Sequence, residues 1–552
     1  MSSNQKKICV IGGGASGLTS IKQCLENNFR VTCYEKTPYI GGLWKYHEED
    51  EDGIASVMKS TIINSSKEMS SFSNFLPDAN LPNYMHNTNM VRYLEDYANQ
   101  FDLRSHVKTN HEVISVKRST DYDESGKWLV SVRNVTSGEE SEEIFDGVLI
   151  CTGHHVKPLI PVFEGEENFK GKIFHSHSYK KPTEDFVGKS FLVIGVGNSG
   201  GDVAVELSNI ASKCYLSTRR GAWVTHRVGP NGWPMDCANL TRSWMGLLTY
   251  IPSFIGNYIW ERQLNARFDH VLYNIKPKHH VTGQHIMIND ALPNKLLSGM
   301  ITAKRNVKKF TPDGVIFEGE NEETKIDIVV LATGYLINFP FLEDGILDMD
   351  PKKNAIKNLY KYVFPVNLKH PTLAFIGLIQ PIGAIFPISE SQARWFCELM
   401  KGNVTPPGVD EMIKDIEKKR KEIESRYYEG ERHTIQVDWL PYMDEINSMI
   451  GTKPDLIKYL FSDFTLWRHL LFGPAIPAQY RLQGPNQWNG ARDAILGVEE
   501  RIRTPLNSRG MMKEFKPETN FIFCLKAIGY IIAAYFVIHF IFEEIIDEIF
   551  FD

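Results

Sequence analysis

The chain has 552 residues, which is long enough for two or more hydrophobic cores. Its 61 Lys and Arg nearly balance its 67 Asp and Glu, for a formal net charge of −6, so we expect no nucleic-acid partner. The eight cysteines form no C-x-x-C pair and no cluster with metal-ligand spacing, so we expect no disulfide framework, no metal site and no dithiol reductase.

A strand, a glycine-rich turn and a helix are predicted at the start of the chain. The apolar run 8–11 leads directly into Gly12-x-Gly14-x-x-Gly17. Such a turn lets backbone N–H groups approach a pyrophosphate at a helix N-terminus. The second predicted strand, 31–34, ends at Glu35, whose carboxylate suits the ribose diol of FAD or NAD. The predicted nucleotide contacts are Gly12, Gly13, Gly14, Ala15, Ser16, Gly17 and Glu35.

The same arrangement recurs after the apolar run 191–194, as Gly195-x-Gly197-x-x-Gly200. Thr218, followed by Arg219 and Arg220, stands where the ribose-binding acid would be. A guanidinium suits a 2′-phosphate, so this site is predicted to bind NADPH, although both arginines could instead be solvated surface charges. Two such motifs suggest an enzyme that passes electrons between two nucleotides.

Two further buried strands, 148–151 and 328–332, each end in Thr-Gly. They predict an α/β fold with two Rossmann-like domains, in which an NADPH domain (154–330) is inserted into a discontinuous FAD domain (1–153 and 331–440). Residues 441–510 would complete the catalytic part. The aromatic-rich insertion 237–285 has no strand alternation and could cover the active site, enter a membrane interface or form a separate packing cluster.

Residues 521–542 are apolar except for Lys526 and His539. As a helix they would span about 33 Å, close to the thickness of a bilayer core. Basic residues precede the segment and acidic residues follow it, so 511–552 is predicted as a membrane-anchoring tail whose basic side is cytosolic. A monotopic hairpin and a buried terminal helix are the alternatives. No signal peptide is expected, because a strand begins by Lys7.

Several short motifs together resemble the eukaryotic flavin-containing monooxygenases. Between the glycine turns lies Phe169-x-Gly171-x-x-x-His175-x-x-x-Tyr179, a pattern shared with Baeyer–Villiger monooxygenases. The other matching segments are 41–44 (GGLW), 64–69 (NSSKEM), 197–200 (GNSG), 332–335 (ATGY) and 483–485 (QGP). The resemblance covers residues 5–506, with departures at Tyr179 and Gly201.

The resemblance implies an order of reaction. NADPH reduces FAD, O2 adds to the reduced flavin, and the resulting hydroperoxyflavin oxygenates a soft nitrogen or sulfur atom of a small molecule. The alternatives are Baeyer–Villiger oxygenation of ketones, an NADPH oxidase-like activity, a reductase that does not use O2, and an inactive membrane scaffold. The resemblance and the tail together place the protein in the endoplasmic reticulum membrane with its catalytic part in the cytosol, and leave a homo-oligomer open.

The resemblance also implies roles for individual residues. Asn64 matches the family's asparagine beside the flavin and NADP⁺, and is the candidate catalytic residue; the alternative is an ordinary asparagine in a turn before a helix. Asp202 is expected to orient its loop rather than to touch phosphate, and His175 to transfer no proton. The remaining predicted cofactor contacts are Leu43, Trp44, Ser65, Asn198 and Ser199.

Overall fold

The structure is a computed structural model that describes residues 5–427 and 434–510. Its first parallel sheet has the strand order β24-β7-β1-β2-β3. The apolar residues of β1 (Lys7–Ile11) are buried, as expected for a central parallel strand. Helix α1 (Ala15–Glu26) connects β1 to β2. The other strands are β2 (Arg30–Tyr34), β3 (Val107–Lys108), β7 (Gly147–Ile150) and β24 (Leu373–Phe375).

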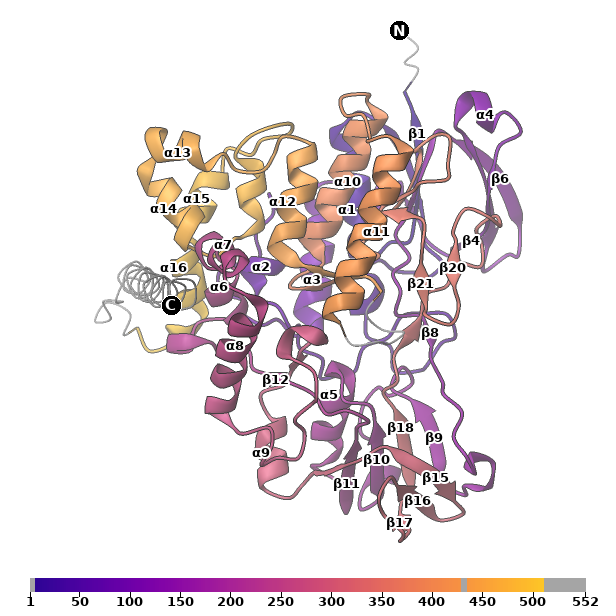
Figure 1. The fold of residues 1–552 in the computed structure, drawn as a ribbon. Coiled ribbons are helices and arrows are strands. Elements are labelled where there is room, and N and C mark those ends of the chain that lie inside the picture. The colour runs from indigo at the N-terminus through magenta and orange to yellow at the C-terminus, as the bar shows by residue number, and fades with distance from the viewer. Residues whose placement is uncertain (1–4, 428–433, 511–552) are drawn as a thin grey trace, which may run out of the picture.

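The second parallel sheet has the order β14-β11-β10-β18-β9 and lies at the opposite end of the molecule (Figure 1). Helix α5 (Asn198–Leu207) follows β10 as α1 follows β1. All five strands fall between β7 and β24 in the chain, so the first sheet is completed only after the second. The strands are β9 (Lys172–His175), β10 (Ser190–Ile194), β11 (Lys213–Ser217), β14 (Thr302–Lys304) and β18 (Ile328–Leu331).

These two sheets confirm the predicted α/β fold with one nucleotide fold inserted in another. The Phe169–Tyr179 motif contributes β9, the edge strand of the second sheet, where His175 pairs with Leu331 of β18. Two three-stranded antiparallel sheets accompany the parallel ones. They are formed by β4 (His111–Arg118), β5 (Trp128–Asn134) and β6 (Glu140–Phe145), and by β15 (Val307–Thr311), β16 (Gly314–Phe317) and β17 (Thr324–Lys325).

Helix α10 (Phe386–Met400) lies parallel to α1, and the two are side by side in Figure 1. Ser16 Oγ lies 3.0 Å from Ser389 Oγ near the N-terminal ends, and Cys24 Sγ lies 3.8 Å from Cys397 Sγ further along. The N-termini of both helices therefore face the same region beside the first glycine turn. Helix α12 (Trp439–Met449) packs on α10. The charged helix α11 (Val409–Arg426) lies between these two helices in the chain and packs against β22 (Leu359–Tyr360).

The aromatic-rich insertion folds into three helices: α6 (Met235–Asn239), α7 (Arg242–Tyr250) and α8 (Ser253–Arg267). Helix α7 packs against α14 (Phe464–Phe472), which follows α13 (Leu456–Ser462). Among the described residues, no helix has the length and apolar character needed to cross a membrane. The predicted tail, 511–552, lies outside the described residues. The remaining helices are α2 (Lys67–Ser70), α3 (Asn87–Gln100), α4 (Tyr122–Ser125), α9 (Leu292–Leu297), α15 (Ala491–Leu496) and α16 (Val498–Arg503).

Candidate active site between two nucleotide folds

The first glycine turn has no room for side chains at its outer glycines. Gly12 has φ +104°, and a Cβ there would lie 2.8 Å from the Cys151 carbonyl oxygen. A Cβ on Gly17 would lie 1.8 Å from the Gly12 carbonyl oxygen. Both distances are below van der Waals contact, so the turn packs against the end of β7 only when glycine occupies both positions. The predicted nucleotide turn is therefore formed by the backbone itself.

Glu35 lies just after β2, is buried, and faces this turn. Its Oε2 accepts a hydrogen bond from Gly13 N at 2.6 Å, and its Oε1 accepts from Thr37 N at 2.9 Å and Thr37 Oγ1 at 2.8 Å. The carboxylate is thus fixed at the position where a nucleotide ribose is expected. Thr37 was not among the predicted site residues, because a threonine in a loop has no distinctive sequence signal.

A second glycine loop presses against the first. Gly41 N donates to the Gly13 carbonyl oxygen at 3.0 Å, and a Cβ on Gly42, whose φ is +53°, would lie 3.0 Å from Gly14 Cα. This close approach leads the chain into Leu43 and Trp44, which line a large cavity. The Trp44 ring meets Phe386, the first residue of α10, edge-to-face at a centroid distance of 6.3 Å.

The first nucleotide fold fits FAD. The first turns of α1 and α10 contain no acidic residue, and among the described residues no side chain caps either helix. Their N–H groups and helix dipoles therefore favour a pyrophosphate beside the glycine turn. The glycine cradle, the fixed Glu35 and the adjacent Trp44 would hold the cofactor.

The second glycine turn repeats the construction of the first. Gly195 has φ +111°, and its Cβ would lie 2.3 Å from the Ala332 carbonyl oxygen at the end of β18. A Cβ on Gly200 would lie 2.0 Å from the Gly195 carbonyl oxygen. The family pattern usually has cysteine at the position of Gly201, and local packing explains the glycine in this chain. A Cβ there would lie 1.8 Å from Met287 Cε. The glycine thus makes room for a methionine on the neighbouring β13 (Met287–Ile288).

Thr218 follows the end of β11 and shapes the turn that carries the two arginines. Its Oγ1 accepts hydrogen bonds from Gly221 N at 2.9 Å and from Arg220 N at 3.4 Å. Arg219 and Arg220 are exposed and line the same cavity as the second glycine turn. The geometry is that of a basic rim beside a nucleotide turn and fits the 2′-phosphate of NADPH.

One cavity of about 1000 Å³ joins the predicted residues of both nucleotide folds. It contains Leu43 and Trp44 from the first and the glycine turn and arginines from the second. The predicted site residues that line it are Leu43, Trp44, Asn64, Gly195, Gly197, Asn198, Ser199, Gly200, Asp202, Thr218, Arg219 and Arg220. The residues from Gly12 to Gly17, together with Glu35 and Ser65, do not line this cavity, and their cofactor contacts stay a prediction.

Asn64 lies on the wall of this cavity, two residues before Ser66. Ser66 caps helix α2, because its Oγ accepts from Met69 N at 3.4 Å. The Asn64 Oδ1 atom accepts a hydrogen bond from Arg227 Nη2 at 2.6 Å. Arg227 belongs to no recognisable motif, and sequence reasoning did not find it.

Three other predicted side chains bind protein groups. Asn198 Oδ1 accepts from Ile288 N at 2.8 Å, and Ser65 Oγ lies 2.7 Å from Ser70 Oγ. Asp202 Oδ1 accepts from Asn289 Nδ2 at 2.8 Å, and burial raises the pKa of Asp202 to about 6. The Asn289 contact is consistent with the expectation that Asp202 orients the loop.

The cavity also contains histidines that could not be predicted from the sequence, because they belong to no recognised motif. His155 and His285 both line it, together with Tyr335. Burial lowers the pKa of His155 to about 4 and lowers that of His285 as well. Near neutral pH both imidazoles are therefore uncharged, so they add no acidic proton to the site.

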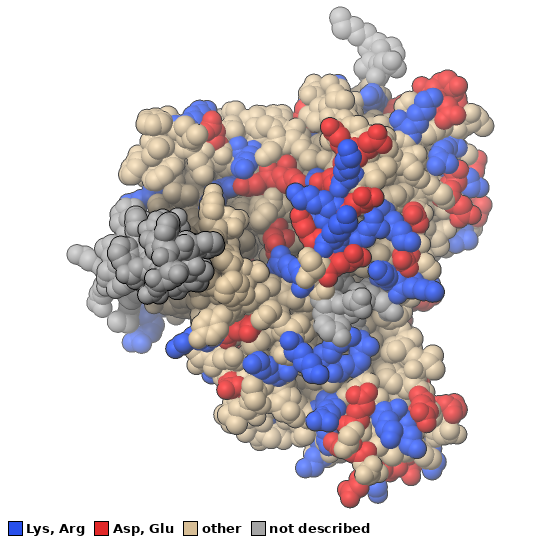
Figure 2. Space-filling view, in the orientation of Figure 1, with Lys and Arg blue, Asp and Glu red and all other residues tan. Residues whose placement is uncertain are grey.

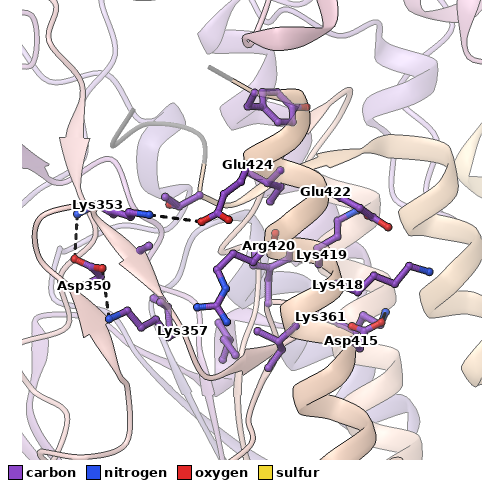
Figure 3. A pocket seen from close by; sticks show the side chains of 18 of the residues that line it. Asp350, Lys353, Lys357, Lys361, Asp415, Lys418, Lys419, Arg420, Glu422 and Glu424 are labelled. Carbon is purple, nitrogen blue, oxygen red and sulfur yellow. Dashed lines mark hydrogen bonds and ion pairs between the residues drawn. The ribbon is translucent and has the colours of Figure 1, made fainter. Parts of the chain in front are cut away.

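A second cavity, of about 790 Å³, lies between α11 and the hairpin of β20 (Met349–Asp350) and β21 (Ala355–Ile356). Figure 3 shows its charged lining, in which Lys353 pairs with Glu424 at 3.5 Å and Lys357 with Asp350 at 3.4 Å. None of the predicted site residues lines it. The joint cavity of the two nucleotide folds is therefore the candidate active site.

Comparison with known proteins agrees with this geometry. A family model described as flavin-binding monooxygenase-like matches residues 5–541. Flavin-containing monooxygenase 5 of Rattus norvegicus is 49% identical over 508 residues, which cover 92% of this chain and 94% of that protein. Flavin-containing monooxygenase 2 of Homo sapiens is 42% identical over 528 residues, covering 95% and 97% of the two chains.

Solved structures share the fold at lower identity. S-allyl-L-cysteine S-oxygenase from Allium sativum superimposes with a TM-score of 0.62 at 22% identity, covering 92% of this chain and all of that one. Cyclohexanone monooxygenase from Rhodococcus sp. Phi1, bound to NADP⁺, gives 0.59 at 16% identity and covers 82% and 98%. On these findings the chain is a flavoprotein monooxygenase that uses FAD and NADPH, and it belongs to the flavin-containing monooxygenase family.

Proposed function

We propose that the protein uses NADPH and O2 to oxygenate soft nucleophilic nitrogen or sulfur atoms of small molecules. The observation that carries the proposal is the position of Asn64. Its amide lines one cavity with the second glycine turn and with Leu43 and Trp44 of the first fold. A single site where two nucleotides meet suits electron transfer from one to the other, followed by oxygen transfer to a third molecule.

When bound, FAD supplies the redox and oxygen-transfer chemistry, and NADPH supplies the electrons. The chain's own residues bind and orient the two cofactors and exclude water from the site. The two glycine turns and helix N-termini hold the phosphates, and Trp44 with Phe386 forms an apolar wall. Asn64 offers an amide, which hydrogen-bonds without providing an acidic proton. His155, held neutral by burial, likewise adds no acidic proton to the site.

The proposal is tested by supplying one thioether and one ketone, each with NADPH and O2. We expect sulfoxide in nearly equal amount to the NADPH consumed. Ester from the ketone in place of sulfoxide would establish Baeyer–Villiger oxygenation instead. Hydrogen peroxide without either product would show an oxidase, and NADPH consumption without O2 would show a reductase.

We also propose the domain division given by the sequence: 1–153 with 331–440 for FAD, 154–330 for NADPH, and 441–510 to complete the catalytic part. The separation of strands supports this division, because every strand of the second parallel sheet lies between residues 172 and 331. The assigned cofactor contacts of both glycine turns form part of the same proposal.

Arg219→Ala should weaken binding of NADPH more than of NADH. Thr218 and the two arginines stand where an acid would select NADH, and both arginines line the cavity beside the second glycine turn. Losing a charge-assisted contact should cost about 1.5–3 kcal/mol, or roughly 10- to 150-fold in affinity. The measurement is the ratio of NADPH to NADH dissociation constants. Because Arg220 can share the contact, retention of the preference in the double variant would show that another residue binds the 2′-phosphate.

We propose that the protein is tethered to the endoplasmic reticulum membrane by its C-terminal segment, with the catalytic part in the cytosol. The apolar run 521–542 supports this, and a patch on helices α7, α8, α13 and α14 adds to it. Figure 2 shows mixed charges over α11 but mostly uncharged residues on the visible surface over α8 and α13. The exposed apolar side chains there include Tyr250, Phe254, Tyr258, Ile457, Phe461 and Phe464.

Ending the chain after residue 512 should make the protein extractable from membranes by carbonate while it still binds FAD. The removed segment lies beyond every nucleotide contact, and a spanning helix resists carbonate whereas an interfacial helix does not. The measurement compares pelleted protein before and after carbonate for the full and shortened chains. Release of the full chain by carbonate would contradict a transmembrane tail and favour interfacial attachment.

A further inference from the structure

The hydrogen bond to Asn64 fixes which end of its amide faces the cavity. Arg227 Nη2 donates to Asn64 Oδ1 at 2.6 Å. A guanidinium carries only donors, so it can bind the oxygen of an amide but not its NH2 group. Rotating the Asn64 amide by half a turn would place its NH2 group against the guanidinium, so that two donors would face each other. The contact therefore selects one of two orientations and leaves the NH2 group as the donor that Asn64 offers elsewhere.

Arg227 is itself held rigidly on two sides. Its Nη1 donates to Asp290 Oδ2 at 3.0 Å, and its backbone N donates to Asp290 Oδ1, also at 3.0 Å. On the other side, Nε donates to the Ile63 carbonyl oxygen and Nη2 to the Ile62 carbonyl oxygen, both at 3.3 Å. The side chain is only 15% exposed. With these partners the guanidinium has little rotamer freedom, so its position relative to Asn64 is defined.

The same contacts connect the aromatic-rich insertion to the site. Arg267 ends helix α8, and its Nη1 lies 3.9 Å from Asp290 Oδ1. On the other side of the Asn64 segment, Asp236 of α6 accepts from Ser66 N through Oδ2 at 2.6 Å. Residues 62–66 are thus bound from both sides by residues of the second fold and its insertion.

We infer that Arg227 is a positioning residue for Asn64, and that it presents the Asn64 NH2 group to the cavity shared by the two nucleotide folds. Asp290 holds Arg227 in place and acts one step further away. The inference rests on the proposed role of Asn64 as the contact to NADP⁺. It adds that the contact depends on a residue far away in the sequence, on the loop after β12 (Val224–Thr225).

The test is a double-mutant cycle on the purified holoenzyme with Asn64→Ala, Arg227→Met and the double variant. The NADP⁺ dissociation constant is measured from the change in the flavin absorbance spectrum, without turnover. Arg227→Met should weaken NADP⁺ binding about 3- to 10-fold, the range for one lost hydrogen bond. In the Asn64→Ala background the same substitution should change it by less than about twofold, because the group that Arg227 positions is gone.

Two further variants sharpen the result. Arg267→Met removes the other arginine beside Asp290. Arg267 is not among the hydrogen-bond partners of Asn64, so the Arg267→Met variant should bind NADP⁺ like the parent protein. Arg227→Lys keeps the charge and a single donor nitrogen, so it should restore part of the binding that Arg227→Met loses. If Arg227→Met does not fold with FAD, the cycle is run with Arg227→Lys and judged by the same criterion.

Equal weakening of NADP⁺ binding by the Arg227 substitution in both backgrounds would overturn the inference, because Arg227 would then act without Asn64. A different result would overturn the proposed function of Asn64: unchanged NADP⁺ binding and unchanged product per NADPH in Asn64→Ala. Asn64→Asp further distinguishes the inference about Arg227 from the proposed role of Asn64. It keeps a partner for Arg227 but has no NH2 group, so it should behave like Asn64→Ala.

Discussion

Glu390→Gln is expected to lower the free energy of unfolding by about 3–5 kcal/mol, because it removes one partner from a buried ion network. Glu390 is 1% exposed and accepts hydrogen bonds from Arg481 Nη2 at 2.7 Å, Ser73 Oγ at 2.7 Å and Ser73 N at 2.6 Å. The substitution keeps the side-chain volume but leaves the buried Arg481 without its closest counter-charge and places an NH2 group among donors. The measurement is the denaturation midpoint of the holoenzyme in urea.

The matched control is Glu112→Gln, which removes a carboxylate from an exposed pair. Arg133 Nη2 lies 2.7 Å from Glu112 Oε2, but these side chains are 45% and 39% exposed. Exposed pairs contribute about 0–1 kcal/mol, so its midpoint should hardly move. Equal midpoints for the two variants would show that the buried network adds no more stability than a surface pair.

The same network gives the protein an acid-sensitive component of stability. Burial alone would raise the pKa of Glu390, but the charges of Arg481, Lys22 and Arg394 outweigh it and lower the pKa to about 2. A carboxyl whose folded pKa lies below its unfolded value of 4.5 stabilises the fold above that pH. We expect this contribution to fall as pH drops from about 4.5 towards 2. The pH dependence of the midpoint should be flatter in Glu390→Gln.

The sequence was sufficient to predict the two nucleotide folds, because both depend on local patterns. The glycines of each turn sit where a Cβ would overlap a carbonyl oxygen, as at Gly12 and Gly195, so their identity is dictated by short-range geometry. Glu35 could be placed because it follows a strand at a characteristic distance. These features involve residues close together in the chain, or strands whose order follows from general rules.

Residues that act over long sequence separations could not be predicted. Arg227 contacts Asn64, and Arg481 contacts Glu390, only because the fold brings distant segments together. Neither arginine belongs to a pattern, and a single charged residue in a loop is usually solvated. Gly201 had no explanation until the structure placed Met287 against it. The chain folds the insertion into helices α6 to α8, whose aromatic residues gave no usable periodicity in advance.

Asn64→Ala is expected to retain FAD but to lose most oxygenation, with product per NADPH reduced by about 10²-fold, the scale for removing one preorganised donor from an active site. The reason is the position of Asn64 on the cavity wall where both nucleotide folds meet, with its Oδ1 already bound to Arg227. Alanine removes the NH2 donor while leaving Glu35 and the first glycine turn untouched. NADPH should then be oxidised without oxygen transfer, and the missing oxygen should be recovered as hydrogen peroxide.

The measurement compares NADPH consumed, sulfoxide formed and hydrogen peroxide released, alongside the FAD content of the purified protein. Asn168→Ala is a suitable control, because the Asn168 side chain is exposed, donates to Glu167 at 3.0 Å and does not line the cavity. It should match the parent protein in all four quantities. A normal sulfoxide yield per NADPH in Asn64→Ala would remove Asn64 from the reaction, whereas loss of FAD would show that the amide supports the flavin fold rather than oxygen transfer. Only retained FAD combined with diverted oxygen fits an amide that serves the reaction through NADP⁺ and the flavin together.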